Sequence, residues 1–510
     1  MMGTKVRAFA SLCNRSVEDL VPDDNFYRHL EAKLDLGFVR DLVRTTYKDC
    51  GRPSVDPRVF FKLQLVMFFE GIRSERELVR VAADRLSVRW YLGYDLDEAL
   101  PDHSSLTRIR KRYGLAVFRR FFETIVEQCR DAGLVWGKEL YFDATQVKAN
   151  ASLDSIAPRF AVEAHLGELF TDEAADEVAS VESVSQPIEL LVPITDAERE
   201  QLADANEERH DWLARDGAPD RTIIRDGYRR RSDFEASTTD PDAALMAHKK
   251  GGLHFGYHDH YAVDGGKARI ILEVLVTPAD VMENLPFLDM LWRVCFRWQI
   301  RPDQVTGDTT YGTVDNIVPV EDQKIRAYVP LPDFDKRTPF YGASRFTYDP
   351  DRDEYCCPEG QVLRRRKAKY TEGVVVYRAE AATCNACPVK AACTESSQGR
   401  QVQRSLYAEY LDRVRAYHET AAYEKAMAKR KVWVEPLFGE AKDWHGLRRF
   451  RLRRLWKVNA EALLIATGQN LKRLLGKRGW GRRPWPNEAP EAPFTRRFLA
   501  QPLRWSPSLV

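Results

Sequence analysis

The stretch that decides the fold is KELYFD at residues 138–143, followed directly by ATQVKAN at residues 144–150. It comes after a long region in which apolar residues recur at helical spacing, and here the spacing changes to every second residue. A period of two places alternate side chains on opposite faces of a strand, so the stretch predicts a β-strand that closes at the carboxylate of Asp143. The chain is therefore expected to change from helical to sheet-forming structure at about residue 136.

Further strands and helices are predicted downstream, in an order typical of a mixed sheet with helices on its faces. They comprise strands at 253–263 and 268–276, joined by the turn sequence DGG at 264–266, a helix at 281–298, strands at 304–306 and 324–331, and a helical region at 406–475. Pro436 predicts a kink or restart inside this last region. The fold class that follows is α/β, preceded by an all-helical N-terminal region.

The length of 510 residues indicates two to four domains, because single hydrophobic cores rarely grow beyond about 300 residues. Hydrophobic residues make up 44% of the chain, which is ample for packed cores and excludes a disordered or fibrous protein. No apolar run is long enough to span a bilayer, and the first residues carry no export signal. We therefore expect a cytoplasmic protein whose nine cysteines are mostly thiols or metal ligands.

The nearly balanced total of 78 basic and 76 acidic residues hides a strong asymmetry. Residues 163–208 hold fourteen acidic residues and one basic residue, whereas residues 429–483 hold sixteen basic and four acidic residues. The basic block with its interleaved aromatic residues is typical of a nucleic-acid surface, since cations neutralise phosphates and aromatic rings stack on bases. A solvated amphipathic helix is the alternative for this block. For the acidic block, a solvated insertion is favoured over a shield for the basic site.

Three acids stand where a metal site could form. Asp143 closes the first strand, Asp308 follows the strand at 304–306, and Glu435 lies in the helical region near Lys429. Phosphodiester chemistry on DNA uses two divalent ions, and hard cations such as Mg²⁺ prefer carboxylate ligands. Carboxylates at strand ends are usually ordinary surface residues, so the spacing alone does not decide between these readings.

A cysteine group lies in the turn-rich segment at residues 333–405. Cys357, Cys384, Cys387 and Cys393 provide the four thiolates that a tetrahedral structural Zn²⁺ would need. The segment has too few apolar residues to fold alone, and a metal would staple it. Cys356 competes with Cys357 for the first position, and unpaired thiols in a loop insertion are the alternative.

Several stretches, in this order along the chain, resemble a DDE transposase of a bacterial insertion sequence. They are SVEDLVP at 16–22, GRPSVDP at 51–57, GIRSEREL at 71–78, PDHSS at 101–105, DATQVKAN at 143–150, GDTTYG at 307–312, VEPLFGEAK at 434–442 and GLRRF at 446–450. The resemblance covers most of residues 15–475. It implies a ribonuclease H-like mixed sheet with flanking helices, preceded by an all-α domain and interrupted by a small cysteine-rich β insertion.

The resemblance also implies site residues and chemistry. Asp143, Asp308 and Glu435 would be the catalytic acids and the ligands of two Mg²⁺ (or Mn²⁺) ions, with Lys442 meeting a phosphate beside them. Glu440 is a rival third acid, but only Glu435 has the family's spacing to a lysine. The family's arginine and tyrosine positions hold Lys431 and Ala428 here. This departure concerns strand-end handling and leaves the three acids intact.

The function implied is a transposase that binds the terminal inverted repeats of an insertion sequence and catalyses metal-dependent strand cleavage and strand transfer. Its partners would be double-stranded DNA, at the element termini and the target, and a second copy in a homodimeric synaptic complex. It would act in the cytoplasm, at the nucleoid. The alternative is a catalytically inactive, sequence-specific DNA-binding protein derived from a transposase.

The expected organisation has five parts: a helical DNA-binding domain at 15–135, the first part of the catalytic domain at 136–332 with an acidic insertion at 151–250, a zinc-ribbon-like insertion at 333–405, the C-terminal catalytic helices at 406–475, and a basic tail at 476–510. The expected DNA contacts are the sequence-reading candidates Arg108, Lys111 and Arg112 and the further basic residues Lys148, Lys431, Arg448 and Arg449. Contacts of the basic block should go mostly to phosphates and set affinity more than sequence choice.

Overall fold

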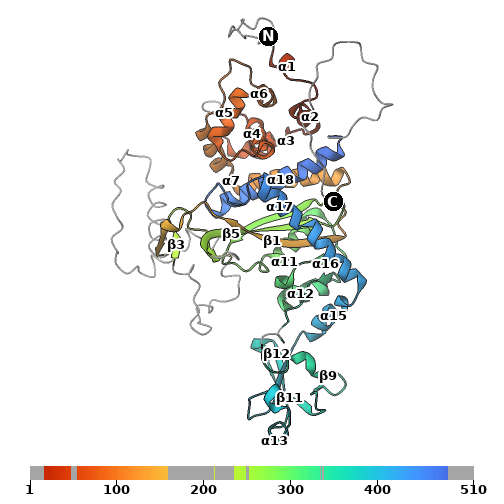
Figure 1. Ribbon diagram of the computed structural model, residues 1–510. Helices are drawn as coiled ribbons and strands as arrows, with labels where there is room; N and C mark the ends of the chain where they lie inside the picture. Colours follow the sequence, from red (N-terminus) through yellow and green to blue (C-terminus); the bar gives the residue numbers. More distant parts are fainter. Residues whose placement is uncertain are drawn as a thin grey trace, which may run out of the picture.

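The computed structural model describes residues 16–47, 54–158, 212, 235–247, 252–333, 335 and 338–480 (Figure 1). The acidic block at 163–208 and residues 481–510 of the basic tail lie outside the described residues. Trp212, which follows the acidic block in the chain, is described singly. Among the described helices, none combines the length and apolar character needed to cross a bilayer.

The N-terminal region is helical, as the spacing of its apolar residues predicts. Its helices are α1 (Val17–Leu20), α2 (Phe26–Lys33), α3 (Phe38–Val43), α4 (Pro57–Glu70), α5 (Glu75–Asp84), α6 (Leu86–Leu92) and α7 (His103–Asp131). Helix α4 shows why these boundaries arise: Asp56 caps its first turn, Pro57 occupies the first position, and Gly71 ends it in the left-handed conformation. Helix α7 is interrupted at Gly114, whose φ of 61° and ψ of −178° are not helical.

A six-stranded mixed sheet follows. Its strands are β1 (Glu139–Lys148), β4 (Ala244–Ala247), β5 (Leu253–Asp264), β6 (Ile271–Pro278), β7 (Gln304–Thr306) and β8 (Arg326–Tyr328). Strand β5 pairs antiparallel with β1 on one side and with β6 and β4 on the other. On its other side β1 pairs parallel with β7, and β7 pairs parallel with β8. The long hairpin of β5 and β6 turns at the predicted DGG sequence.

Three sequence predictions need correction: two concern strands of this sheet, and one concerns the helix that follows β6. The first strand does not close at Asp143, because residues 144–148 continue the ladder with the twelve-residue strand β5 as far as Gly256. Asp143 therefore lies in the middle of β1. The helix expected from residue 281 begins only at Phe287, as α11 (Phe287–Trp298), after Pro286 at its N-cap. The strand expected at 324–331 is confined to β8.

Helices from the C-terminal region cover the sheet. They are α15 (Ala408–His418), α16 (Ala421–Trp433), α17 (Glu435–Trp444) and α18 (Leu455–Lys477), with α12 (Val314–Asp322) beside α15. The predicted restart at Pro436 is confirmed, because α16 ends at Trp433 and α17 begins with Pro436 in its first turn. Figure 1 shows α18 and α7 lying between the sheet and the remaining N-terminal helices.

Helix α18 joins the N-terminal helices and the sheet into one hydrophobic core. It packs against α7 and α4 on one side and against β6 on the other. At Gly468 a side chain would meet the ring of Phe68 at 2.4 Å, so α4 and α18 are in direct contact there. The buried apolar residues of both regions form a single continuous cluster.

A separate five-stranded antiparallel sheet lies between β8 and α15 in the chain. Its strands are β9 (Thr347–Asp349), β10 (Glu354–Cys356), β11 (Val362–Lys369), β12 (Val374–Arg378) and β13 (Gln401–Ser405), with short helices α13 (Ala381–Asn385) and α14 (Lys390–Cys393). It has a small apolar core of its own around Tyr355, Leu363 and Tyr377. The strands β2 (Ile156–Pro158) and β3 (Glu235–Ser237) form a short antiparallel pair. They stand at the two ends of residues 159–234, most of which lie outside the described part of the chain.

Candidate active site

Asp143 is a half-buried carboxylate in the middle of the central strand β1. Its Oδ2 atom lies 3.2 Å from Nη1 of Arg430 on α16, and only 14% of its side chain is exposed. Burial raises the pKa of Asp143 to about 6, although Arg430 opposes the rise, and the negative charges of Asp308 and Glu435 add to it. The charges of Asp308 and Glu435, the other two predicted acids, thus act on Asp143.

Asp308 reaches the site from the neighbouring strand. Strand β7 pairs with β1 through Tyr141 and Thr306, and the chain turns directly after Thr306. The Asp308 carboxylate accepts a hydrogen bond of 2.8 Å from the Thr310 amide, which fixes its direction at the start of a short 3₁₀ turn. Gly307 is needed at this turn, because a side chain there would meet the Tyr311 ring at 2.7 Å. Parallel pairing thus sets Asp308 beside Asp143.

Glu435 is the first residue of α17 and completes the group. Its Oε1 atom lies 3.7 Å from Nη2 of Arg430, so this one guanidinium faces both Glu435 and Asp143. The Glu435 side chain is 53% exposed, and the site is therefore open to solvent on this side. Arg430 directly precedes Lys431, the residue at the family's arginine position, and is not among the site residues predicted from the sequence. The break between α16 and α17 turns it into the site, and no local sequence pattern predicts that orientation.

Glu440, the rival third acid, points elsewhere. Its carboxylate binds Lys472 at 2.5 Å and Arg473 at 3.2 Å, both on α18. Burial raises the pKa of Glu440, but the His445 imidazole, whose Nε2 lies 3.8 Å from Oε1, and the charges of Arg473 and Lys472 outweigh it and hold the pKa well below its ordinary value. Glu440 therefore serves the packing of α17 on α18.

Lys442 lies two turns after Glu435 and donates a hydrogen bond of 2.5 Å to Oγ1 of Thr145 on β1. Thr145 is two residues beyond Asp143 and on the same face of the strand. Burial lowers the pKa of Lys442, whereas the charge of Asp259 raises it. Lys442 is therefore brought to the face of β1 that carries Asp143, and the Asp143 charge also raises its pKa.

The three acids do not form a complete metal site in the observed geometry. Within the described part of the chain, no three His, Cys, Asp or Glu side chains meet closely enough to form a ready-made metal site. Around the three acids, Arg430 stands between Asp143 and Glu435. The donor set nevertheless suits a hard cation, since it offers three carboxylates and one of them is open to solvent.

Three of the predicted DNA-binding residues lie together beside the site. The loop after α17 forms a parallel bridge with the end of β1: Lys148 donates its amide to the Arg448 carbonyl at 3.3 Å, and Phe450 donates to the Lys148 carbonyl at 2.9 Å. Lys148, Arg448 and Arg449 are all exposed there. The Arg73 guanidinium from the N-terminal region binds the carbonyls of Gly446 and Arg449 and fixes the loop, a role that sequence reasoning missed.

The other predicted DNA-binding residues are exposed on helices. Arg108, Lys111 and Arg112 lie on the first half of α7, before the break at Gly114, and Lys431 lies on α16. The Arg112 guanidinium sits 4.9 Å above the Tyr47 ring, and Arg108 contacts Ser105. The structure thus places the α7 residues in the N-terminal helical region, apart in the chain from the loop beside β1.

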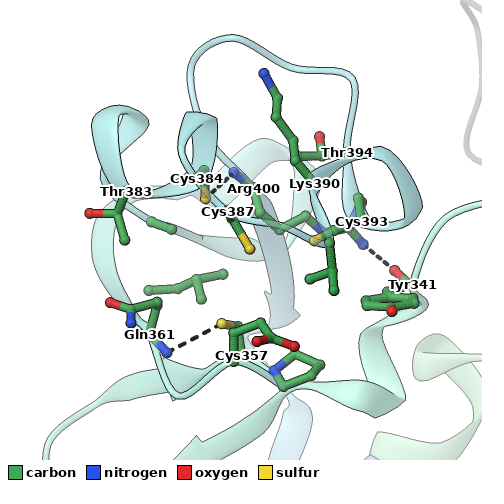
Figure 2. A pocket seen from close by; sticks show the side chains of 15 residues that line it. Tyr341, Cys357, Gln361, Thr383, Cys384, Cys387, Lys390, Cys393, Thr394 and Arg400 are labelled. Atoms are coloured by element: carbon green, nitrogen blue, oxygen red, sulfur yellow. Dashed lines mark hydrogen bonds between the residues drawn. The ribbon is translucent and has the colours of Figure 1, made fainter.

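The four predicted zinc ligands surround one pocket in the second sheet (Figure 2). Cys357 comes from the turn after β10, Cys384 and Cys387 from α13 and the turn after it, and Cys393 from α14. Burial raises the pKa of the Cys393 thiol, with Arg400 opposing the rise and the other three cysteines adding to it. Cys356 is exposed and does not line the pocket, so Cys357 is the member of that pair that joins the group.

Two family models match the chain. A transposase domain (DUF772) matches residues 15–112, from the N-terminal helices to the first half of α7, and a transposase DDE domain matches residues 356–475, from β10 to the end of α18. Neither the curated proteins nor the solved structures include a match. Glu435, Lys442 and the four cysteines fall inside the second range, whereas Asp143 and Asp308 lie between the two.

Both matching models describe transposase domains, one at each end of the described chain. More narrowly, they support a DDE-type transposase of an insertion sequence, and the resemblance seen in the sequence motifs is confirmed. Because such domains act on DNA, DNA is the partner that the family implies.

Proposed function

We propose that this protein binds the terminal inverted repeats of an insertion sequence and catalyses metal-dependent DNA strand cleavage and strand transfer. The observation that carries the proposal is that the Arg430 guanidinium faces both Asp143 and Glu435, while the charge of Asp308 also acts on Asp143. These acids come from β1, the turn after β7 and the start of α17, which are far apart in the chain. Acids from three separate elements that influence one carboxyl group in this way are typical of a functional site.

The arrangement of the sheet supports a ribonuclease H-like catalytic domain. In chain order the five main strands are β1, β5, β6, β7 and β8, and in space they lie in the order β6, β5, β1, β7, β8. The first three form an antiparallel meander and the last two run parallel to β1. We infer that the catalytic acids sit on the central strand and its parallel neighbour in this fold.

The proposed roles follow from the contacts. Two Mg²⁺ or Mn²⁺ ions held by the three carboxylates would activate a water for cleavage or a 3′-hydroxyl for strand transfer and would stabilise the leaving oxygen. Arg430 reduces the repulsion between Asp143 and Glu435, and Lys442 would bind a phosphate oxygen of the strand under attack. The hydrogen bond to Thr145 orients Lys442 for this contact.

The exposed basic residues would guide the DNA. Lys148, Arg448 and Arg449 lie where β1 leaves the site, so we propose that they bind phosphates next to the cleaved bond, with Lys431 extending this surface. Arg108, Lys111 and Arg112 on α7 would contact the terminal repeats. Two terminal repeats must be brought together for transfer, and we propose a homodimer for this complex, acting at the nucleoid in the cytoplasm.

The test is a cleavage assay on a duplex that carries the inverted repeats flanking the gene. Asp143→Asn, Asp308→Asn and Glu435→Gln should each abolish Mg²⁺-dependent cleavage while DNA affinity changes little. Glu440→Gln is the matched control, because it removes a nearby acid of the same helix that faces α18, and it should still cleave. Full activity in any of the three variants would remove that residue from the site. Binding without cleavage in the unmodified protein would favour the inactive DNA-binding alternative.

We also propose one structural Zn²⁺ held by Cys357, Cys384, Cys387 and Cys393. The support is that all four line the same pocket and that the other three cysteines add to the rise that burial causes in the pKa of the Cys393 thiol. Within the described residues the four do not meet closely enough to form a ready-made site. Deprotonated thiolates are the form that binds zinc, and binding would offset the cost of gathering four like charges. The metal would stabilise the second sheet by cross-linking its turns, because the apolar core of this sheet is small.

A further inference from the structure

Asp259 is a buried carboxylate in a position where a strand normally carries an apolar residue. It lies in the middle of β5, its exposure is 0%, and within the described residues neither of its oxygens has a hydrogen-bond partner. Burying a carboxylate without hydrogen-bond partners is energetically costly. A residue that costs this much and forms no structural contact is a candidate for function.

The surroundings of Asp259 connect it to the proposed active site. In the antiparallel ladder Asp259 is directly opposite Thr145, so both side chains project from the same face of the sheet. Thr145 accepts the hydrogen bond from Lys442, and Asp143 is on this same face of β1. Lys442 therefore reaches the sheet at Thr145, on the face that also carries Asp143 and Asp259.

The charges on this face support the same connection. Burial raises the pKa of Asp259 far above its ordinary value, and the Lys442 ammonium opposes this rise. Conversely, burial lowers the pKa of Lys442, and Asp259 opposes that shift, with Arg448 lowering the pKa and Asp143 and Asp443 raising it. Each of the two buried groups thus favours the charged form of the other.

We propose that Asp259 is a positioning residue whose buried carboxylate holds the Lys442 ammonium in place beside Asp143, ready to bind the phosphate under attack. This inference rests on the proposed function of Lys442. Asp259 lies behind Lys442 on β5 and acts only through it, without touching DNA or metal. In this proposal Asp259 lowers the stability of the fold, and its function is to keep Lys442 charged and correctly oriented.

The test combines Asp259→Asn with Lys442→Met and the double variant. Asparagine has nearly the same shape and cannot ionise, so Asp259→Asn should fold and be at least as stable as the unmodified protein. Its single-turnover cleavage rate at saturating DNA should nevertheless fall roughly 10-fold, the size typical of a residue that orients a functional side chain. The DNA concentration that gives half the maximal rate should stay the same, because one phosphate contact among many is affected.

The double variant separates positioning from general damage. If Asp259 acts through Lys442, then Asp259→Asn causes no further loss of rate in the Lys442→Met background. An undiminished rate in Asp259→Asn, or an additive loss in the double variant, would overturn the inference.

A readout without DNA keeps this test separate from the proposed function. In unfolding experiments the stability effects of the two single changes should be non-additive, because removing either charge leaves the other unpaired. Additive stability effects would also overturn the inference. If the unmodified protein shows no cleavage that depends on Asp143, the proposed function fails, while the non-additivity of Asp259 and Lys442 can still be measured.

Discussion

Replacing Asp143 by asparagine should make the protein more stable in the absence of divalent metal, although the same change should abolish cleavage. The carboxylate is 14% exposed, and its pKa is raised from 3.8 to about 6, chiefly by burial. A shift of about 2 units corresponds to roughly 3 kcal/mol of unfavourable free energy when the group is ionised. This is an upper limit for the gain in stability, since asparagine also loses the attraction of Arg430.

The gain should depend on pH in a defined way. Below pH 3.8 the carboxyl group is protonated in the folded and unfolded states alike, so the variant gains nothing from the lost charge. Between pH 3.8 and about 6 the unfolded chain releases the proton while the folded protein retains it, and the unmodified protein loses stability relative to the variant. Above about pH 6 the difference should reach its plateau.

The assay is denaturant unfolding of both proteins from pH 4 to pH 8, with and without Mg²⁺. Because a metal ligand must be ionised, Mg²⁺ should stabilise the unmodified protein above pH 6 and should stabilise the Asp143→Asn variant much less. Asp154→Asn is a suitable control, because Asp154 is exposed and lies on a short 3₁₀ turn. A difference between variant and unmodified protein that does not change with pH would refute the reasoning from burial.

Three further predictions follow from the contacts. Glu440→Gln should lower stability at neutral pH by about 1–3 kcal/mol because it breaks the ion pairs to α18. The loss should shrink progressively as the pH falls below about 4.5, where the unfolded glutamate takes up a proton while the folded carboxylate stays ionised; an equal loss at all pH values would contradict this. Metal analysis should find about one zinc per chain, absent after the joint change of Cys384 and Cys387 to serine; reduced protein free of zinc would reject the site. Neutralising Arg448 and Arg449 should weaken binding to terminal and random DNA alike and reduce the salt slope by roughly 2, and a loss confined to terminal DNA would contradict a phosphate role.

The order of strands and helices was predictable because their periodicity is local. The DGG hairpin, the helical N-terminal region and the restart at Pro436 all depend on residues that are neighbours in the chain. The end of β1 was not predictable from KELYFD alone, since residues 144–148 stay in the ladder only because β5 is long enough to pair with them.

The site residues were predicted by motif and spacing, and the structure shows that Arg430 contacts two of them, Asp143 and Glu435. What the sequence could not show is how residues on different elements face each other. Arg430 enters the site through the angle between α16 and α17, and Asp259 is set opposite Thr145 by the strand register. Both depend on three-dimensional placement, for which a single sequence carries no periodic signal.

The contact between Phe68 and Gly468 bears on how new specificity can arise in such a protein. The N-terminal helices that would bind the DNA ends are not an independent module that could be joined to another catalytic domain. Helix α18 supplies part of their hydrophobic core. A transplanted N-terminal region would have to bring a matching α18 surface, including a residue as small as glycine at position 468. Recognition and catalysis in this architecture would therefore be inherited as a unit, and specificity would diverge by exchange of exposed side chains on α7.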